Sequence, residues 1–107
     1  MSCPYQIEIE IRGVNPDRMD DIHDACMGEW SFRNLDRYYI DDEYVISGLG
    51  TGSLGGCEED LADRIAEAAW NANRGYCAVI VHATCLESIP YMTHKRLHND
   101  YERKLAA

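Results

Sequence analysis

The sequence predicts a single α+β domain of the ferredoxin-like class, in which two helices cover one face of a four-stranded antiparallel sheet. Three observations support this prediction: strands with alternating polarity, two amphipathic helical segments, and the order β-α-β-β-α-β followed by an added C-terminal helix. A chain of 107 residues has room for one such domain, over residues 1–107, and not for two. Because sequence does not determine strand pairing, another α+β sandwich with a different strand order is the alternative.

The first strand is predicted over residues 5–12, because apolar and polar side chains alternate there with a period of two. Such a strand has one dry and one wet face. Asn15 is expected to cap the helix that follows, with Pro16 in its first turn. Apolar residues at spacings of three and four continue to Cys26, and Gly28 is expected to end this helix.

A β-hairpin is predicted next, because residues 35–40 and 44–49 are rich in tyrosine, isoleucine and valine. The polar tripeptide Asp41-Asp42-Glu43 between them has the composition of a hairpin turn. Glycines then recur through residues 48–56. We expect this stretch to be a flexible connection to the next helix.

The second helix is predicted over residues 58–73, where small alanines in the apolar arc indicate close packing on a sheet. Gly75 is expected to end it. The long apolar run over residues 76–86 is typical of a central strand that is covered on much of both faces. A last helix is expected after Pro90, and its buried side would carry Leu97, Tyr101 and Leu105.

The formal net charge of −9 argues against direct nucleic-acid binding and against docking on an anionic membrane. The acidity is concentrated, since residues 1–67 hold 16 acidic and 5 basic side chains. No secretory signal and no apolar run of membrane-spanning length is visible, so we expect a cytoplasmic protein. Five cysteines without a C-x-x-C pair are typical of free thiols in a reducing compartment.

Three local patterns resemble catalytic or ligand sites. Residues 50–55 read G-x-G-x-x-G between a predicted strand and a helix, which is the form of a dinucleotide-binding turn. The three acids that open the following helix would repel a phosphate. Cys57 at that helix start and His82 in the apolar strand are candidates for a small enzyme or a nucleotide-binding or ligand-binding domain. His94 and His98 lie four residues apart, but the neighbouring basic residues disfavour a metal, and we expect no cofactor.

Acidic and aromatic residues cluster in the remaining segments, and they favour a non-enzymatic protein-binding module. Amphipathic rings are enriched at binding surfaces, and carboxylates around them suit a basic protein partner. The alternative is that most of these rings complete a small core. The candidate partner-binding residues are Asp36, Tyr38, Tyr39, Asp41, Asp42, Glu43, Tyr44, Glu58, Glu59, Asp60 and Trp70.

The C-terminal half carries a further pattern in the phrases Gly55-Gly56-Cys57-Glu58, Ala69-Trp70-Asn71-Ala72-Asn73 and Ala83-Thr84-Cys85-Leu86-Glu87-Ser88-Ile89-Pro90. In these phrases the chain resembles small uncharacterised proteins of tailed bacteriophages and prophages. The resemblance implies a setting in the host-cell cytoplasm, where small acidic phage proteins often bind host proteins. Some anti-CRISPR inhibitors imitate nucleic acid with surface carboxylates. No functional residue is carried over from the resemblance.

The leading hypothesis is therefore an inhibitor from a phage or mobile element that presents acids and tyrosines to a basic host protein, such as a nucleic-acid-binding complex. A small enzyme that uses residues 50–55 with Cys57 or His82 is the second hypothesis. The third is a structural or assembly subunit that associates with itself. A monomer and a homodimer are both compatible with the sequence.

Overall fold

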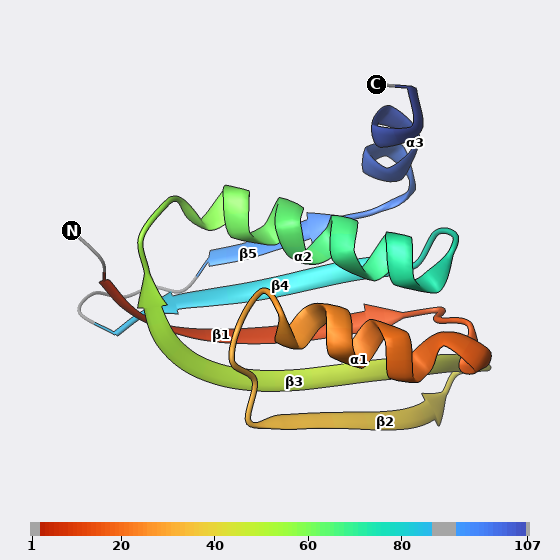
Figure 1. Cartoon of the computed structure of the whole chain (residues 1–107), viewed down its shortest axis with the longest axis horizontal. Coiled ribbons are helices and arrows are strands. Elements are labelled where there is room, and N and C mark those ends of the chain that lie inside the picture. The colour runs from red at the N-terminus through yellow and green to blue at the C-terminus, as the bar shows by residue number, and fades with distance from the viewer. Residues whose placement is uncertain (1–2, 87–91, 107) are drawn as a thin grey trace.

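Five strands form one antiparallel sheet in the order β2-β3-β1-β4-β5, and α1 and α2 lie together on one face of it (Figure 1). This computed structural model describes residues 3–86 and 92–106. The mixed α+β class is confirmed. The strands are β1 (Cys3–Arg12), β2 (Asn34–Ile40), β3 (Glu43–Leu54), β4 (Ala78–Cys85) and β5 (Met92–Arg96), and the helices are η1 (Pro16–Arg18, a 3-10 turn), α1 (Met19–Met27), α2 (Glu58–Asn73) and α3 (His98–Ala106).

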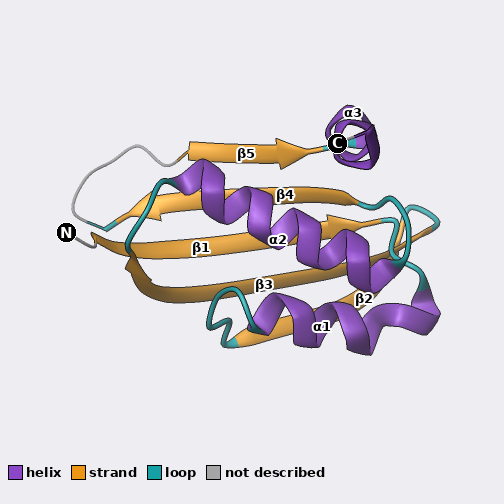
Figure 2. Cartoon of the chain, turned by 45° about the horizontal axis from the view of Figure 1, so that its top comes forward, coloured by secondary structure: helices purple, strands orange, loops and turns teal. Residues whose placement is uncertain are grey.

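The central strand β1 pairs with β3 on one side and with β4 on the other, both antiparallel. Its alternation has the predicted effect, because Ile7, Ile9 and Ile11 are fully buried beneath the helices. The intervening polar residues lie on the opposite face of the sheet, which the two helices leave uncovered (Figure 2). The main core therefore lies between the sheet and the α1–α2 layer.

The turn between β2 and β3 consists of Asp41 and Asp42, which both have positive φ angles of 53° and 61°. Two such residues in a two-residue connection are the requirement of a type I′ hairpin turn. The predicted hairpin is confirmed, but Glu43 belongs to β3 and pairs with Ile40. The turn is thus one residue shorter than the polar tripeptide suggests.

The glycine-rich stretch is a strand and not the expected flexible connection, because β3 continues to Leu54. A Cβ atom at Gly50 would lie 2.2 Å from the backbone oxygen of Ser31, and one at Gly52 would lie 3.2 Å from the Trp30 ring. The loop after α1 therefore rests directly on the sheet. Trp30 Nε1 also donates a hydrogen bond to the Gly50 carbonyl oxygen, at 3.0 Å. The close approach of this loop is what requires glycine at these positions.

Helix α2 spans the predicted residues, Glu58–Asn73, but the residue that ends it is not the predicted one. Arg74, and not Gly75, adopts the left-handed conformation at φ 59° and donates its backbone N–H to the Trp70 carbonyl oxygen. The side chain of Asn73, the last helical residue, is buried, accepts the backbone N–H of Asn15 and donates to the backbone oxygen of Gly75. The helix therefore ends through the left-handed Arg74 and the side-chain hydrogen bonds of Asn73, and not through the glycine that the sequence suggests.

The predicted C-terminal helix is two elements. Residues 92–96 form β5, which pairs with β4, and α3 starts only at His98. Tyr101 is half-buried and its ring lies 5.3 Å from that of Trp70, as expected of a buried side. Leu97 and Leu105 are instead exposed, at 41% and 67%. Pro90 lies outside the described residues.

The helices of residues 3–86 and 92–106 all lack the combined length and apolar character that a transmembrane segment requires.

Candidate functional site

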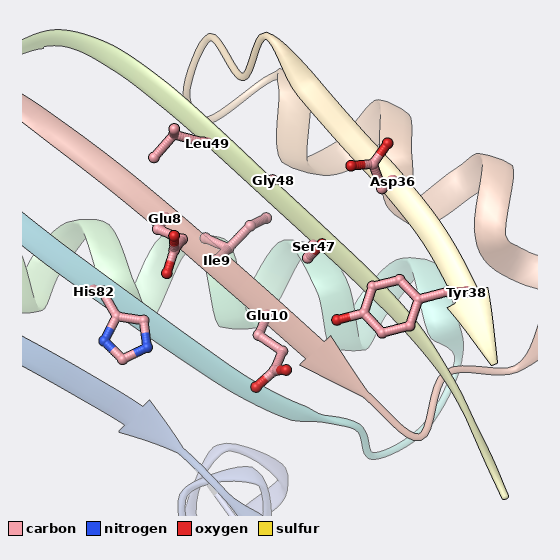
Figure 3. Close-up of a pocket in the computed structure, with 9 residues that line it drawn as sticks. All are labelled: Glu8, Ile9, Glu10, Asp36, Tyr38, Ser47, Gly48, Leu49 and His82. Carbon is pink, nitrogen blue, oxygen red and sulfur yellow. The ribbon is translucent and has the colours of Figure 1, made fainter. Parts of the chain in front are cut away.

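The sheet face opposite α1 and α2 carries the polar side chains of β1 and is left uncovered by both helices. Figure 3 looks onto this face, with the helices behind the sheet. We call it the open face. By the pairing register, its central residues on β1, β2, β3 and β4 are Gln6, Glu8, Glu10, Arg12, Asp36, Tyr38, Val45, Ser47, Leu49, Ile80, His82 and Thr84.

One row of paired residues across the strands places a small residue between two carboxylates, one on each side. Ser47 on β3 lies directly opposite Glu10 on β1 and directly opposite Asp36 on β2. Side chains in such a row project from the same face. Because Ser47 is short, the surface sinks between the two longer acidic side chains.

A hollow of about 520 Å³ occupies this depression. Tyr38 extends from β2 across β3, so its ring forms one end of the hollow (Figure 3). A second hollow of about 370 Å³ continues along β1 and β4, and Glu8 and His82 line both. The first is lined by Glu8, Ile9, Glu10, Asp36, Tyr38, Ser47, Gly48, Leu49 and His82, and the second by Gln6, Glu8, His82 and Thr84.

The charges around the hollows are only partly balanced. Within the described ranges, Glu8 and Asp36 take part in no ion pair. Glu10 lies 3.7 Å from Arg12, whose Nε donates to Glu43 at 3.1 Å. This hydrogen bond is the largest cause that raises the pKa of Arg12 above its ordinary value, so Arg12 stays charged at the hairpin end. The centre of the open face is thus left acidic.

The structure places the predicted hairpin residues on two different faces. Asp36 and Tyr38 line the hollow, and Glu43 and Asp41 bind Arg12 at its margin. The rings of Tyr39 and Tyr44 are 4.8 Å apart and lie, by alternation, toward the helix side. Asp42 is exposed at the tip.

The predicted acids at the start of α2 lie far from the hairpin. The α2 end of β3 pairs with Cys3 and the hairpin end with Arg12, which are about 30 Å apart along β1. Glu58 is engaged within the fold, since it accepts hydrogen bonds from Tyr5 at 2.7 Å and bonds to His94 at 2.9 Å. Its neighbours Glu59 and Asp60 are exposed. These acids do not form one surface with the hairpin acids.

Trp70 is a core residue and does not fit the prediction of an exposed anchor. It is only 5% exposed, and its Nε1 donates to the backbone oxygen of Cys77 at 2.8 Å. It lies on the inner side of α2, where a partner cannot reach the face of its ring. In the sequence Trp70 lies at the border of the apolar arc of this helix, a position that is compatible with either burial or exposure.

The groups of the enzyme alternative do not converge. Gly50 and Gly52 lie in β3, Cys57 lines a hollow of about 400 Å³ at the start of α2, and His82 lies on the open face. No cluster of metal-ligating residues occurs in the part of the chain that the structure describes. His94 lies on β5 and His98 on α3, so the two histidines do not share the single helix on which their spacing of four would place them on one face.

Thiol chemistry is restricted to few positions, because Cys26 and Cys77 are buried. Loss of solvation raises the pKa of each from the ordinary 9.0 to about 12. We expect both to resist iodoacetamide at neutral pH in the native state and to react after unfolding in urea, whereas Cys57 is exposed and reacts first. Peptide mass mapping reads this out.

The same burial predicts a pH dependence of stability. The unfolded chain loses these two protons above about pH 9, whereas the folded chain keeps them to about pH 12. The free energy of unfolding should therefore fall with rising pH in this window, by roughly 1.4 kcal/mol per pH unit for each thiol. Urea titrations of the double variant Cys26→Ala/Cys77→Ala should show a weaker fall, and an unchanged slope would contradict the assignment.

Sequence reasoning missed Glu8, Glu10 and Ser47 as site residues. Their signal was present, because the wet face of the first strand carries the two glutamates at alternate positions. What was missing was the register that sets this face beside Asp36. Comparison of the chain with protein-family models, with curated proteins and with solved structures finds no match.

Proposed function

We propose that this protein is a non-enzymatic, acidic protein-binding module that receives a basic surface of a partner protein on its open face. The observation that carries the proposal is the hollow between Glu10 and Asp36, on a sheet face that no described helix covers. An uncovered face with unbalanced carboxylates and an exposed tyrosine matches the composition of a surface that binds a cationic partner. A host protein that itself binds nucleic acid fits this description, because its surface is already shaped for closely spaced negative charges.

The net charge of the whole chain supports the same partner class. With −9 in total, the molecule attracts basic proteins from a distance and increases their association rate. Salt screens such attraction over a Debye length of about 8 Å at physiological ionic strength. The binding is therefore expected to weaken as salt is added. Such a module would act as an inhibitor that a phage or mobile element produces in its host cell.

The narrower fold assignment belongs to the same proposal. The first four strands with α1 and α2 make a ferredoxin-like unit, and β5 and α3 are additions to its edge. The connectivity β-α-β-β-α-β and the order β2-β3-β1-β4 support this assignment. In this unit the helices occupy one face only, so the other face is available to a partner.

The test is affinity capture with matched charge reversals. Glu8→Lys/Asp36→Lys changes the open face, and Asp24→Lys/Glu67→Lys makes the same net change on exposed positions of α1 and α2. Basic host proteins that the wild type and the helix variant retain should be lost from the open-face variant. Mass spectrometry identifies them, and circular dichroism verifies the fold. If both variants retain the same proteins, the open face is not the binding surface.

A further inference from the structure

We propose that the open face holds an extended segment of the basic partner that carries arginine at alternate positions. One arginine would lie above Ser47, between Glu10 and Asp36, and the next above Leu49, beside Glu8. This inference rests on the proposed function and names the chemistry of the partner at the same face. Spacing, shape and charge each contribute to it.

The spacing argument comes from β1. Glu8 and Glu10 are two residues apart and project from the same face of the strand, so their backbone positions differ by about 6.6 Å. Alternate side chains of an extended peptide repeat with the same distance. The two hollows adjoin along β1 and share Glu8 and His82, so an extended segment finds a continuous trough beneath it.

The shape argument comes from the row through Ser47. Neighbouring strands are about 4.8 Å apart, so Glu10 and Asp36 are separated by about 10 Å at the backbone. A planar guanidinium above Ser47 can donate hydrogen bonds to carboxylates on both sides, whereas a lysine ammonium acts as a compact point charge. The ring of Tyr38, which is 39% exposed, offers a face on which a guanidinium stacks.

The charge argument concerns the carboxylates of the open face and their ion pairs within the chain. Within the described residues, Glu10 is the only one of the three carboxylates in an ion pair, and its 3.7 Å contact with Arg12 is longer than the Arg12–Glu43 contact of 3.1 Å. The residue opposite Glu8 on β4 is His82. Lys95 is on the same face, but Ile80 separates it from Glu10 in the row. A bound arginine therefore supplies a permanent positive charge that no described arginine or lysine brings to Glu8 or Asp36 in an ion pair.

Peptide probes test the inference directly. The first peptide alternates arginine and serine, the second has the same composition with all its arginines in one block, and the third alternates lysine and serine. Each is titrated at low salt into isotope-labelled protein, and amide chemical shifts locate the binding. The alternating arginine peptide should perturb the central residues of β1, β2 and β3 and bind the most tightly of the three.

Matched variants define the site. Glu10→Gln/Asp36→Asn should weaken the alternating arginine peptide about tenfold, because two charge-assisted contacts are lost. Asp24→Asn/Glu67→Gln removes the same charge from the helices and should leave its affinity nearly unchanged. Equal weakening by both variants would overturn the arginine site, because it would indicate only a long-range effect of net charge. Equal affinity of the block peptide would overturn the spacing, and equal affinity of the lysine peptide would overturn the preference for arginine.

Failure of the inference and failure of the proposed function can be told apart. Peptides that fail to bind the open face, while basic host proteins still depend on Glu8 and Asp36, overturn the extended arginine segment and leave the binding module in place. Host proteins that do not depend on these residues overturn the binding module itself.

Discussion

Gly50→Ala is expected to destabilise the protein by about 3 kcal/mol, a large share of the 5–15 kcal/mol that typically holds a domain folded. The added Cβ would lie 2.2 Å from the Ser31 backbone oxygen and 2.9 Å from the Phe32 Cα. Both neighbours are backbone atoms, which cannot rotate away as a side chain can. The loop after α1 would have to lift from β3, and Trp30 would then lose its hydrogen bond to the Gly50 carbonyl.

The matched control is Gly55→Ala. A Cβ at Gly55 meets no atom within 4 Å, so this substitution should have little effect or stabilise slightly, because alanine restricts the unfolded chain. Urea denaturation followed by tryptophan fluorescence measures both variants. Equal stability of the two would show that Gly50 has no role in seating the loop on the sheet.

Asn73→Asp is expected to cost about 3 kcal/mol, although the two side chains have nearly the same size. Asn73 Oδ1 accepts the backbone N–H of Asn15 at 2.7 Å, and its Nδ2 donates to the backbone oxygens of Gly75 and Tyr76, both at 3.2 Å. A carboxylate keeps the first contact and loses both donors. It also sets a buried negative charge against two carbonyl oxygens.

Asn71→Asp is the control for the amide chemistry. Asn71 is exposed on the same helix, and its Oδ1 accepts from Lys104 Nζ at 2.9 Å, a contact that a carboxylate can keep. The free energy of unfolding of the Asn71→Asp variant should differ from that of the wild type by less than about 0.5 kcal/mol. If Asn73→Asp is equally mild, Asn73 does not join the entry of α1 to the exit of α2.

Local periodicity was sufficient for much of the fold. The alternation in β1 and the helical spacing in α1 and α2 report which side of each element faces the core, and burial of Ile9 and Ile65 agrees with them. Both patterns arise within one element, so sequence alone reveals them. The hairpin was equally visible, because tyrosine-rich strands flank a polar turn.

Residues 92–96 show what local patterns miss. This segment is polar and has no apolar alternation, so nothing within it indicates a strand. Its place is decided by distant partners, since it pairs with β4 and bonds to α2 through Arg96–Asp63 at 2.6 Å and His94–Glu58 at 2.9 Å. Distant contacts also decide the end of β3. Its glycines predict a flexible segment from sequence, whereas in the fold Trp30 packs against them.

For the open face, the sequence by itself determined which residues share the wet side of each strand. It therefore determined that Glu8 and Glu10 lie on one face, and the charge count already predicted an acidic surface. Only the tertiary structure decided that Asp36 lies beyond Ser47 from Glu10 and that both helices leave this face uncovered. The physical reason is that side-chain alternation belongs to the backbone of one strand, whereas register and layering depend on hydrogen bonds and packing between segments far apart in the chain.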